Sequence, residues 1–481
     1  MKTIALSAAV ILAASTALAQ TGDIVVKQYD TGGVYEGTFK DGKQHGIGTY
    51  RLPNGYEYSG EWDMGVIRGQ GTLRLPNGSV YEGNLEDGQP DAMGKMTYAD
   101  GMIYEGTFKA GVIDGAGIAR YADGSVYEGG FQAATLHGKG TLTTPNGYRY
   151  EGDWVQGVRS GKAVIKYHDG ATYRGDMVEN QRHGTGVLIM LDGMTYEGEW
   201  KDDQIDGQGV LKMPDGAVYE GAMVQGRRTG PGKMTYANGN IYEGGFLNNM
   251  RHGVGLFRTP EGRTLEGEWA NDALNGQGKA TYEDGAVYEG QFKDARPDGQ
   301  GTITFANRTT YTGEWVEGRI EGEGTMRDVN GLVYTGSFKN GKNHGRGKIV
   351  YGEGHSYDGD WLEGERHGKG RVTFSDGVVY EGDFLRGKRH GIGKIVLPDG
   401  FSYEGEWKDG ILNGTGTATY ANGDIYTGEF VNGLRQGQGK MVYASGREYD
   451  GFWVAGKRAT QEEAETGSVA ETQPATETVA D

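Results

Sequence analysis

The stretch YEGEWKDGILNGTGTATYANGDI, residues 403–425, decides the fold, because the chain repeats its pattern every 23 residues. The tripeptide Y-x-G opens nineteen such copies, from Tyr35 to Tyr449, and Leu265 is the one replacement for the tyrosine. No insertion or deletion separates the copies. A fixed period of this size is typical of one supersecondary unit that is stacked many times. We therefore look for function on a long repetitive surface.

Two turn signals divide each repeat into two short strands. With the tyrosine as position 1, positions 20 and 21 read Asn-Gly or Asp-Gly in most copies, as in Asn54-Gly55. Such pairs favour a type I′ turn, in which both central residues have positive φ. A second turn falls near positions 7 to 10, as in Asp41-Gly42. The strands between the turns are predicted to be about six or seven residues long.

The alternation of residue types gives every hairpin one aromatic and one polar face. Positions 1, 3 and 5 read Tyr, Gly and Trp or Phe, whereas positions 2, 4, 13 and 15 are mostly Glu, Lys or Thr. Alternate residues of a strand share a face. A large ring can cover a neighbouring glycine where a Cβ would collide. We therefore predict a continuous aromatic row interleaved with glycines, and expect Gly→Val at Gly290 or Gly336 to be damaging.

These residues resemble the MORN repeat (membrane occupation and recognition nexus), whose pattern Y-E-G-x-[WF]-x-x-G-x-x-x-G-x-G residues 403–425 follow almost throughout. The resemblance covers nearly all of residues 29–458. It implies an all-β fold, an elongated array of consecutive antiparallel hairpins in a single twisted or curved sheet, with under 10% helix. It also implies a scaffold or a tether near membranes.

The chain ends differ from the array in composition. Residues 1–19 read as a secretory signal peptide with cleavage near Ala19 and Gln20, which predicts a periplasmic or secreted protein. Residues 20–28 are interpreted as a linker and residues 29–458 as the array of about nineteen repeats. Residues 459–481 carry six acids and no base, so we expect a disordered acidic tail.

Composition argues against several functions. The net charge of −18 argues against nucleic acid and does not favour anionic lipid head groups, and the absence of cysteine excludes disulfides and thiolate chemistry. Seven histidines recur at position 11, as His344, His367 and His390 do in consecutive repeats. Equivalent positions of successive hairpins lie about 9–10 Å apart, too far to share one metal. We therefore expect no catalytic residue, no cofactor and no metal.

The aromatic row is the candidate interaction surface, either as a structural layer or as a platform for sugar rings or a hydrophobic partner. Its central members are Tyr288, Phe292, Tyr311, Trp315, Tyr334, Phe338, Tyr357, Trp361, Tyr380, Phe384, Tyr403 and Trp407.

Trp and Phe at position 5 mark two repeat classes. A polar residue precedes the tyrosine of each Trp repeat, and Val or Ile precedes that of each Phe repeat. This coupling predicts that one set is more buried than the other. The buried set is Val287, Val333, Val379 and Ile425; the exposed set is Thr310, Ser356, Ser402 and Glu448.

The sequence thus predicts a non-enzymatic, exported repeat scaffold for protein partners that it does not identify. The alternative is a surface that binds cell-envelope glycan or membrane phospholipid. Self-association is a further expectation, because alternating classes could meet different neighbours. A phosphoinositide kinase, an activity found beside such repeats, is rejected because its catalytic segments are missing.

Overall fold

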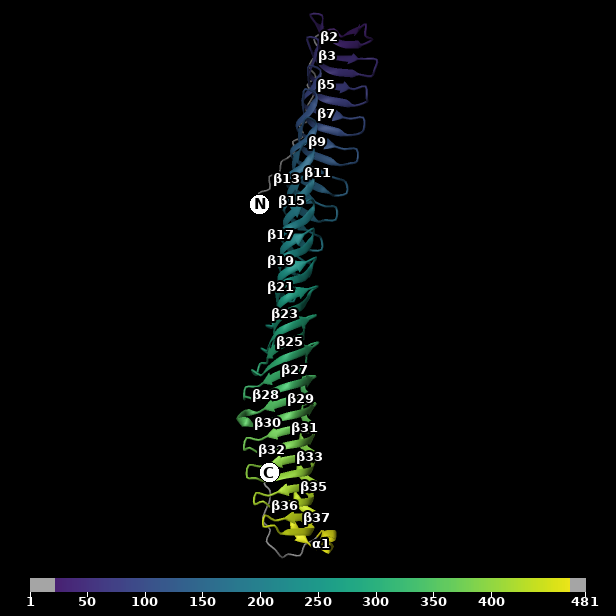
Figure 1. The fold of residues 1–481 in the computed structure, drawn as a ribbon. Helices are drawn as coiled ribbons and strands as arrows, with labels where there is room; N and C mark the ends of the chain where they lie inside the picture. The colour runs from purple at the N-terminus through teal and green to yellow at the C-terminus, as the bar shows by residue number, and fades with distance from the viewer. Residues whose placement is uncertain (1–21, 468–481) are drawn as a thin grey trace. The chain divides into compact units, whose positions relative to one another are not determined.

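The computed structural model describes residues 22–467. The chain divides into two compact units, Met1–Arg227 and Arg228–Asp481. Within each unit every strand pairs antiparallel with the strand that follows it, and the strands lie one after another along the unit (Figure 1). Among the described residues, no pairing joins the first and last strands of a unit. The predicted all-β array of consecutive hairpins is confirmed.

Each repeat contributes one seven-residue and one nine-residue strand. The seven-residue strands of the first unit are β2 (Val34–Lys40), β4 (Glu57–Asp63), β6 (Val80–Glu86), β8 (Ile103–Lys109), β10 (Val126–Gln132), β12 (Arg149–Val155), β14 (Thr172–Val178), β16 (Thr195–Lys201) and β18 (Val218–Val224). Its nine-residue strands are β3 (Lys43–Arg51), β5 (Val66–Arg74), β7 (Gln89–Thr97), β9 (Val112–Arg120), β11 (Thr135–Thr143), β13 (Val158–Lys166), β15 (Gln181–Ile189) and β17 (Gln204–Lys212). Strand β19 (Arg227–Thr235) begins at the last residue of this unit.

The second unit continues the same alternation. Its seven-residue strands are β20 (Ile241–Leu247), β22 (Thr264–Ala270), β24 (Val287–Lys293), β26 (Thr310–Val316), β28 (Val333–Lys339), β30 (Ser356–Leu362), β32 (Val379–Leu385), β34 (Ser402–Lys408), β36 (Ile425–Val431) and β38 (Glu448–Val454). Its nine-residue strands are β21 (Met250–Arg258), β23 (Ala273–Thr281), β25 (Arg296–Thr304), β27 (Arg319–Arg327), β29 (Lys342–Val350), β31 (Glu365–Thr373), β33 (Lys388–Val396), β35 (Ile411–Thr419) and β37 (Leu434–Val442).

A bulge makes the second strand of each hairpin longer than predicted. In the hairpin of β34 and β35 the cross-strand pairs are Tyr403–Ala418, Gly405–Gly416 and Trp407–Leu412. Three residues, 413–415, therefore face the single residue Glu406. Gly414, the middle one, has a φ of 101°, a conformation that favours glycine. The first glycine of the G-x-G pair thus lies in the bulge, and the predicted length of six or seven residues was too short for the second strand.

The type I′ turn lies at positions 7 and 8 of the repeat and not at Asn-Gly. Asp409 and Gly410 close a two-residue hairpin with φ of 52° and 93°, as a type I′ turn requires. In the other turn only Gly423 has positive φ, at 87°. The Oδ1 of Asn422 accepts a hydrogen bond from the N–H of Asp424 over 3.0 Å. The type I′ prediction for Asn-Gly was wrong, because its glycine instead follows a type I-like turn.

Both chain ends add structure outside the repeats. Strand β1 (Val25–Gln28) pairs with β2 inside the segment interpreted as a linker. Strand β39 (Lys457–Ala459) pairs with β38, and the capped helix α1 (Gln461–Thr466) follows it. The start of the expected disordered tail is therefore ordered. Residues 1–21, which include the predicted signal peptide, and residues 468–481 lie outside the described residues.

Helix is scarce in the part of the chain that the structure describes. It consists of α1 and the single turn η1 (Gly352–Gly354), as the sequence predicted. No helix of residues 22–467 has the length and apolar character needed to cross a membrane.

The burial predicted to separate the two repeat classes is not observed. Val287, Val333 and Val379 are half-buried, and so are Thr310, Ser356 and Ser402. Ile425 and Glu448 are both exposed. The prediction was wrong, and nothing in the structure explains the coupling through burial.

Candidate functional site

The aromatic row lies in the buried layer of the sheet. All twelve side chains singled out from the sequence are between 0% and 6% exposed. Rings that are this deeply covered offer no face to a ligand, so their burial favours the structural role. A binding role for the row stays a prediction that would require the layer to open.

Each tyrosine of the row contacts two rings edge-on. The centroid of Tyr288 lies 5.0 Å from that of Phe292 in its own repeat and 5.1 Å from that of Trp315 in the next. The same two contacts recur at Tyr311, Tyr334, Tyr357 and Tyr380. Such pairs stabilise by roughly 0.5–1.5 kcal/mol each beyond area burial. The row therefore links successive repeats as well as filling each one.

The ring of each tyrosine covers a glycine pair of its own hairpin. A Cβ built on Gly416 would lie 2.5 Å from the Cε2 and Cζ atoms of Tyr403. The hydroxyl of Tyr403 donates to the C=O of Glu406 over 2.9 Å. Burial, with a smaller effect of the Glu406 charge, raises the pKa of Tyr403 to about 12. The glycines are therefore required by the rings above them.

Substitution of one of these glycines tests the assignment of the faces. A Cβ on Gly290 would lie 2.6 Å from the carbonyl oxygen of Gln300 and 2.7 Å from the hydroxyl of Tyr288. We expect Gly290→Val to destabilise the protein by about 1–3 kcal/mol through overpacking. The control is Glu289→Val on the exposed polar face, which we expect to change stability by less than about 0.5 kcal/mol. Equal melting temperatures of the two variants would refute the assignment.

The Trp class adds a hydrogen bond that phenylalanine cannot make. The Nε1–H of Trp407 donates to the C=O of Gly393 in the preceding repeat over 3.0 Å. All eight tryptophans make the equivalent bond. This function of the Trp class was not predicted, because position 5 was interpreted only as an apolar ring.

A second link between repeats, the arginine bridge, was also missed. The guanidinium of Arg182, at position 10, lies 4.3 Å from the ring centroid of Trp200 in the next repeat. Its Nε donates to Oδ1 of Asp203 over 3.0 Å, and a terminal nitrogen donates to the C=O of the same residue over 2.7 Å. Arg159, Arg228 and Arg251 bind position 8 of the next repeat in the same way. The signal was the co-occurrence of Arg at position 10 with Asn or Asp at the next position 8.

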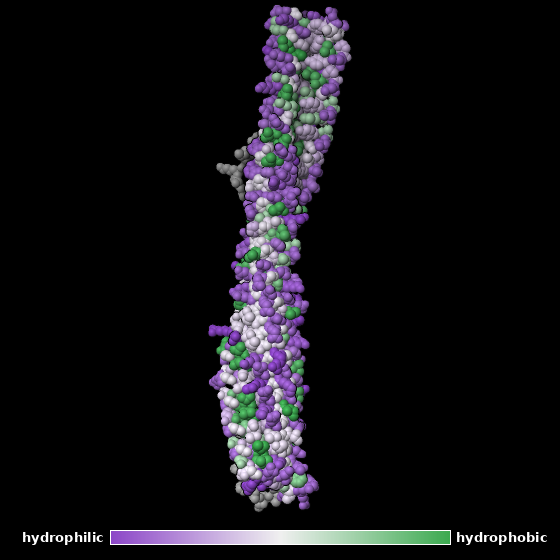
Figure 2. All heavy atoms as spheres, in the orientation of Figure 1, coloured by the Kyte–Doolittle hydropathy of each residue, from purple (hydrophilic) through white to green (hydrophobic). Residues whose placement is uncertain are grey.

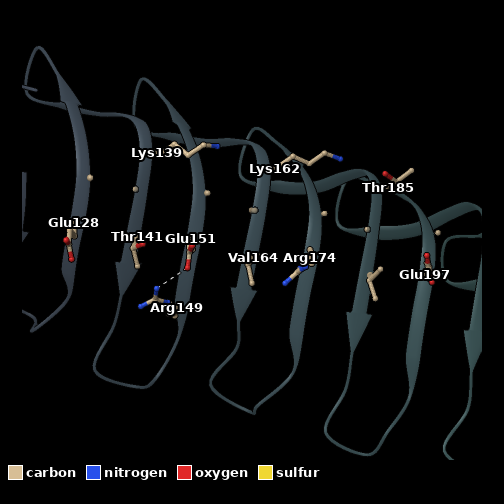
Figure 3. Close-up of a pocket in the computed structure, with 18 residues that line it drawn as sticks. Glu128, Lys139, Thr141, Arg149, Glu151, Lys162, Val164, Arg174, Thr185 and Glu197 are labelled. Carbon is tan, nitrogen blue, oxygen red and sulfur yellow. Dashed lines mark hydrogen bonds and ion pairs between the residues drawn. The ribbon is translucent and has the colours of Figure 1, made fainter. Parts of the chain in front are cut away.

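The polar face forms an open groove, named here the polar groove. In the first unit it spans strands β10–β16 and has a volume of 1260 Å³. Its floor is the backbone of the glycine pairs. Figure 3 shows Lys139, Lys162 and Thr185 along one side of this floor, and Glu151 and Arg174 along the other. Positions 2 and 13 supply these side chains, and position 15 adds Thr141 and Val164, so the same repeat positions build the groove in the hairpins that it crosses.

Two lysines of the polar groove form ion pairs with aspartates on the neighbouring strands. Lys139 lies 2.5 Å from Asp153, and Lys162 lies 2.5 Å from Asp176. The pKa of Asp176 is lowered, because hydrogen bonds from Lys162 and the Thr185 backbone outweigh its desolvation. A second groove of 930 Å³, in the second unit, uses the same repeat positions, with Lys369 3.0 Å from Asp383. Both grooves therefore present charged side chains of both signs.

Residues 22–467 contain no cluster of potential metal ligands. Among the described residues, no three His, Cys, Asp or Glu side chains come close enough to hold a metal ion. His45 and His183 each have Nδ1 3.4–3.5 Å from an aspartate of the following repeat. The histidines therefore lie apart along the array, at one strand position per repeat.

One repeat has leucine in place of the tyrosine at position 1, and a second leucine fills the space that the ring would occupy. Leu265 is 6% exposed and Leu274, at position 10 of the same repeat, is fully buried. The Leu274 side chain lies 3.2 Å from the points where Cβ atoms would stand on Gly267 and Gly278. It thus covers the glycine pair that a tyrosine ring covers elsewhere.

These features define an all-β repeat protein built from hairpins that contact only their neighbours. The sequence profile of the MORN repeat matches eighteen segments between residues 35 and 446, nearly end to end. The chain therefore belongs to the MORN repeat family. A search of curated proteins gave no match.

Solved structures give only remote likeness. The TCP domain of SAS-4 from Drosophila melanogaster, in complex with a proline-rich motif of Ana2, is 18% identical, with 32% of this chain and 85% of that chain covered and a TM-score of 0.22. The TCP10 domain of Danio rerio CPAP, in complex with a STIL peptide, is 15% identical over 57% and 94%, with a TM-score of 0.15. Virginiamycin B lyase of Staphylococcus aureus is 11% identical over 64% and 92%, with a TM-score of 0.11. Such scores carry no argument about function.

Proposed function

We propose that this protein is an exported, non-enzymatic scaffold that binds protein partners along the polar groove. The observation that carries the proposal is that one set of repeat positions builds an open groove in each unit. The buried aromatic row supports this choice, because it leaves the polar face as the extended surface with chemical variety. Exposed hydrophobic residues gather only in separate groups on the face drawn in Figure 2.

The chemistry of the groove favours an extended polypeptide as the partner. Side chains of both signs line it, such as Lys162 and Glu151, together with uncharged residues such as Thr141 and Val164. Complementary charge patterns give a protein interface its register and its specificity. A partner segment that carries charges of both signs could pair with these side chains.

Site-specific photo-crosslinking in the native cell tests the proposal. A photoreactive amino acid at Thr141, in the polar groove, should trap a protein partner. The same residue at Leu191, an 82% exposed loop position outside the groove, is the matched control. Adducts from Thr141 alone would support the proposal; equal adducts from both positions, or none from Thr141, would contradict it. Fractionation of the same cells tests export.

Envelope glycan is the second candidate partner, favoured by a separate cleft in the second unit that is described next. Membrane phospholipid and self-association stay predictions of the sequence. Sedimentation with phospholipid vesicles and light scattering of the purified protein test these two.

A further inference from the structure

A cleft of 660 Å³ opens beside η1 on the aromatic side of the second unit. It is named here the His355 cleft, and its charged and aromatic lining consists of Tyr351, Glu353, His355, Arg366, Phe374, Tyr380, Phe384, Lys388 and Arg389. The loop at its rim, Gly352–Gly354, is the one 3-10 turn of the described chain, and it stands where other repeats carry Asn-Gly or Asp-Gly. Local departure from a repeat is where a specific site would be expected.

Arg366 is the arginine of position 10 in this cleft, and it forms no arginine bridge. Its guanidinium lies over the rings of Tyr357 and Phe384, at 5.7 Å and 5.5 Å from their centroids. The corresponding Arg389 and Arg435 each donate to a backbone C=O of the next repeat. Within residues 22–467, the Arg366 guanidinium has no hydrogen-bond or ion-pair partner. Its N–H groups are therefore available at the cleft.

Positive charge exceeds negative charge in the His355 cleft, although the chain as a whole is acidic. Arg366, Lys388 and Arg389 line it, with Glu353 as the one carboxylate among its described lining residues. A cleft of 750 Å³ on the same side, around Arg263, is balanced instead by Glu283 and Asp284. Of these two clefts, only the His355 cleft has an excess of positive charge, which favours an anionic ligand.

Rings form one wall of the cleft. His355 lies edge-on between Tyr351 and Phe374, with centroid distances of 4.7 Å and 5.0 Å. Tyr351 and Phe374 are half-buried, so part of each ring faces the cleft. Burial, and secondly the Arg366 charge, lowers the pKa of His355 and favours a neutral imidazole. A neutral imidazole can both donate and accept a hydrogen bond.

We propose that the His355 cleft binds a carboxylate-bearing sugar, such as a hexuronic acid residue of a glycan. The planar guanidinium of Arg366 matches a carboxylate bidentately, and Lys388 adds charge at the exposed rim. The apolar face of the sugar ring packs on Tyr351 and Phe374, and the imidazole of His355 forms a hydrogen bond with a hydroxyl group of the sugar. The His355 cleft is separate from the polar groove. The test of sugar binding in the cleft can therefore fail while protein binding in the groove is supported, and the reverse.

Titration of the full-length protein with glucuronate, followed by isothermal calorimetry and ligand-observed NMR, tests the proposal. Glucose and inorganic phosphate are titrated in parallel. We expect glucuronate to bind and both glucose and phosphate to bind at least about tenfold more weakly, because charge-assisted bonds to the carboxylate and ring contacts are both needed. No binding of glucuronate, or binding of glucose or phosphate as tight as that of glucuronate, would overturn the proposal.

Arg366→Gln is the decisive variant, and Arg435→Gln is its matched control at the same repeat position outside the cleft. We expect the first to weaken glucuronate binding about tenfold or more and the second to leave it unchanged. Circular dichroism establishes that both variants fold. If Arg366→Gln does not fold, Lys388→Gln on the exposed rim replaces it, with an expected loss of about threefold. Unchanged affinity in the folded cleft variant would overturn the proposal.

Discussion

Raising the pH from about 10 to about 12 is expected to unfold the array, because the tyrosines of the buried row cannot ionise in place. Burial is the largest cause in every case, and it raises the pKa of seven of them to about 12: Tyr35, Tyr81, Tyr127, Tyr196, Tyr242, Tyr311 and Tyr403. An unfolded tyrosine has a pKa near 10.

The direction of the pH effect on the free energy of unfolding depends on which state, folded or unfolded, keeps the tyrosine protons. Below about pH 10 both states are protonated, so the free energy of unfolding does not depend on these groups. Between about pH 10 and pH 12 the unfolded chain releases protons that the folded chain keeps, and each tyrosine lowers stability by about 1.4 kcal/mol per pH unit. Because many tyrosines act together, we expect a steep transition.

Tyrosinate absorbance and far-ultraviolet circular dichroism, recorded in one alkaline titration, measure this effect. Both signals should change together, since ionisation of the row requires unfolding. If the whole tyrosinate signal appeared near pH 10 with the strand signal intact, the rings would not be buried as described.

Removal of one complete repeat, residues 311–333, is expected to leave a folded protein, whereas removal of residues 311–320 should unfold the neighbouring repeats. The complete deletion joins Thr310 to Tyr334, so Tyr334 takes the place of Tyr311 opposite Ile303. One tryptophan hydrogen bond, from Trp315 to Gly301, is lost. Nearest-neighbour contacts re-form across the join, as expected for a repeat protein.

The shorter deletion removes β26 but leaves most of β27 without its hairpin partner. Its residues would then pair out of register, which places polar side chains on the buried face. The two variants are compared by thermal unfolding, monitored by circular dichroism. Limited proteolysis then shows whether cleavage occurs within residues 287–379. We expect a shift of a few degrees for the complete deletion and loss of the transition in the flanking repeats for the shorter one. Equal tolerance would contradict nearest-neighbour stability.

The alternation of residue types was sufficient to predict the hairpin array, because each hairpin is determined by residues within one period. Tyr403, Gly405 and Trp407 share a face in the sequence pattern and in the structure. The bulge at Gly414 could not be separated from the turn signals, because glycine marks both. Helix α1 was missed because its acidic composition resembles that of disordered tails, although Thr460 and Glu463 form a capping box.

The candidate site was predicted less well, because it depends on contacts between repeats. Residue types alone do not show how completely a ring such as Trp200 is covered, and Arg182 lies directly over it. The hydrogen bond from each indole also crosses a repeat boundary. The His355 cleft arises from a single departure from the repeat, the loop at Gly352–Gly354, whose shape composition does not determine.

The arginine bridges have a consequence for how a chain of near-identical repeats finds its own neighbours while folding. A strand that skipped one repeat would still bury tyrosines against glycines, so the hydrophobic pattern alone leaves such misassembly a competitive trap. Arg251 binds Asp272 in the correct neighbour, but one repeat further on it would meet Ala295 at the same position. Arg182 would likewise exchange Asp203 for Gly226. The skipped pairing would lose the hydrogen bond from the arginine Nε to the side-chain oxygen at position 8, so the arginine bridges favour the correct neighbour in the repeats that carry them.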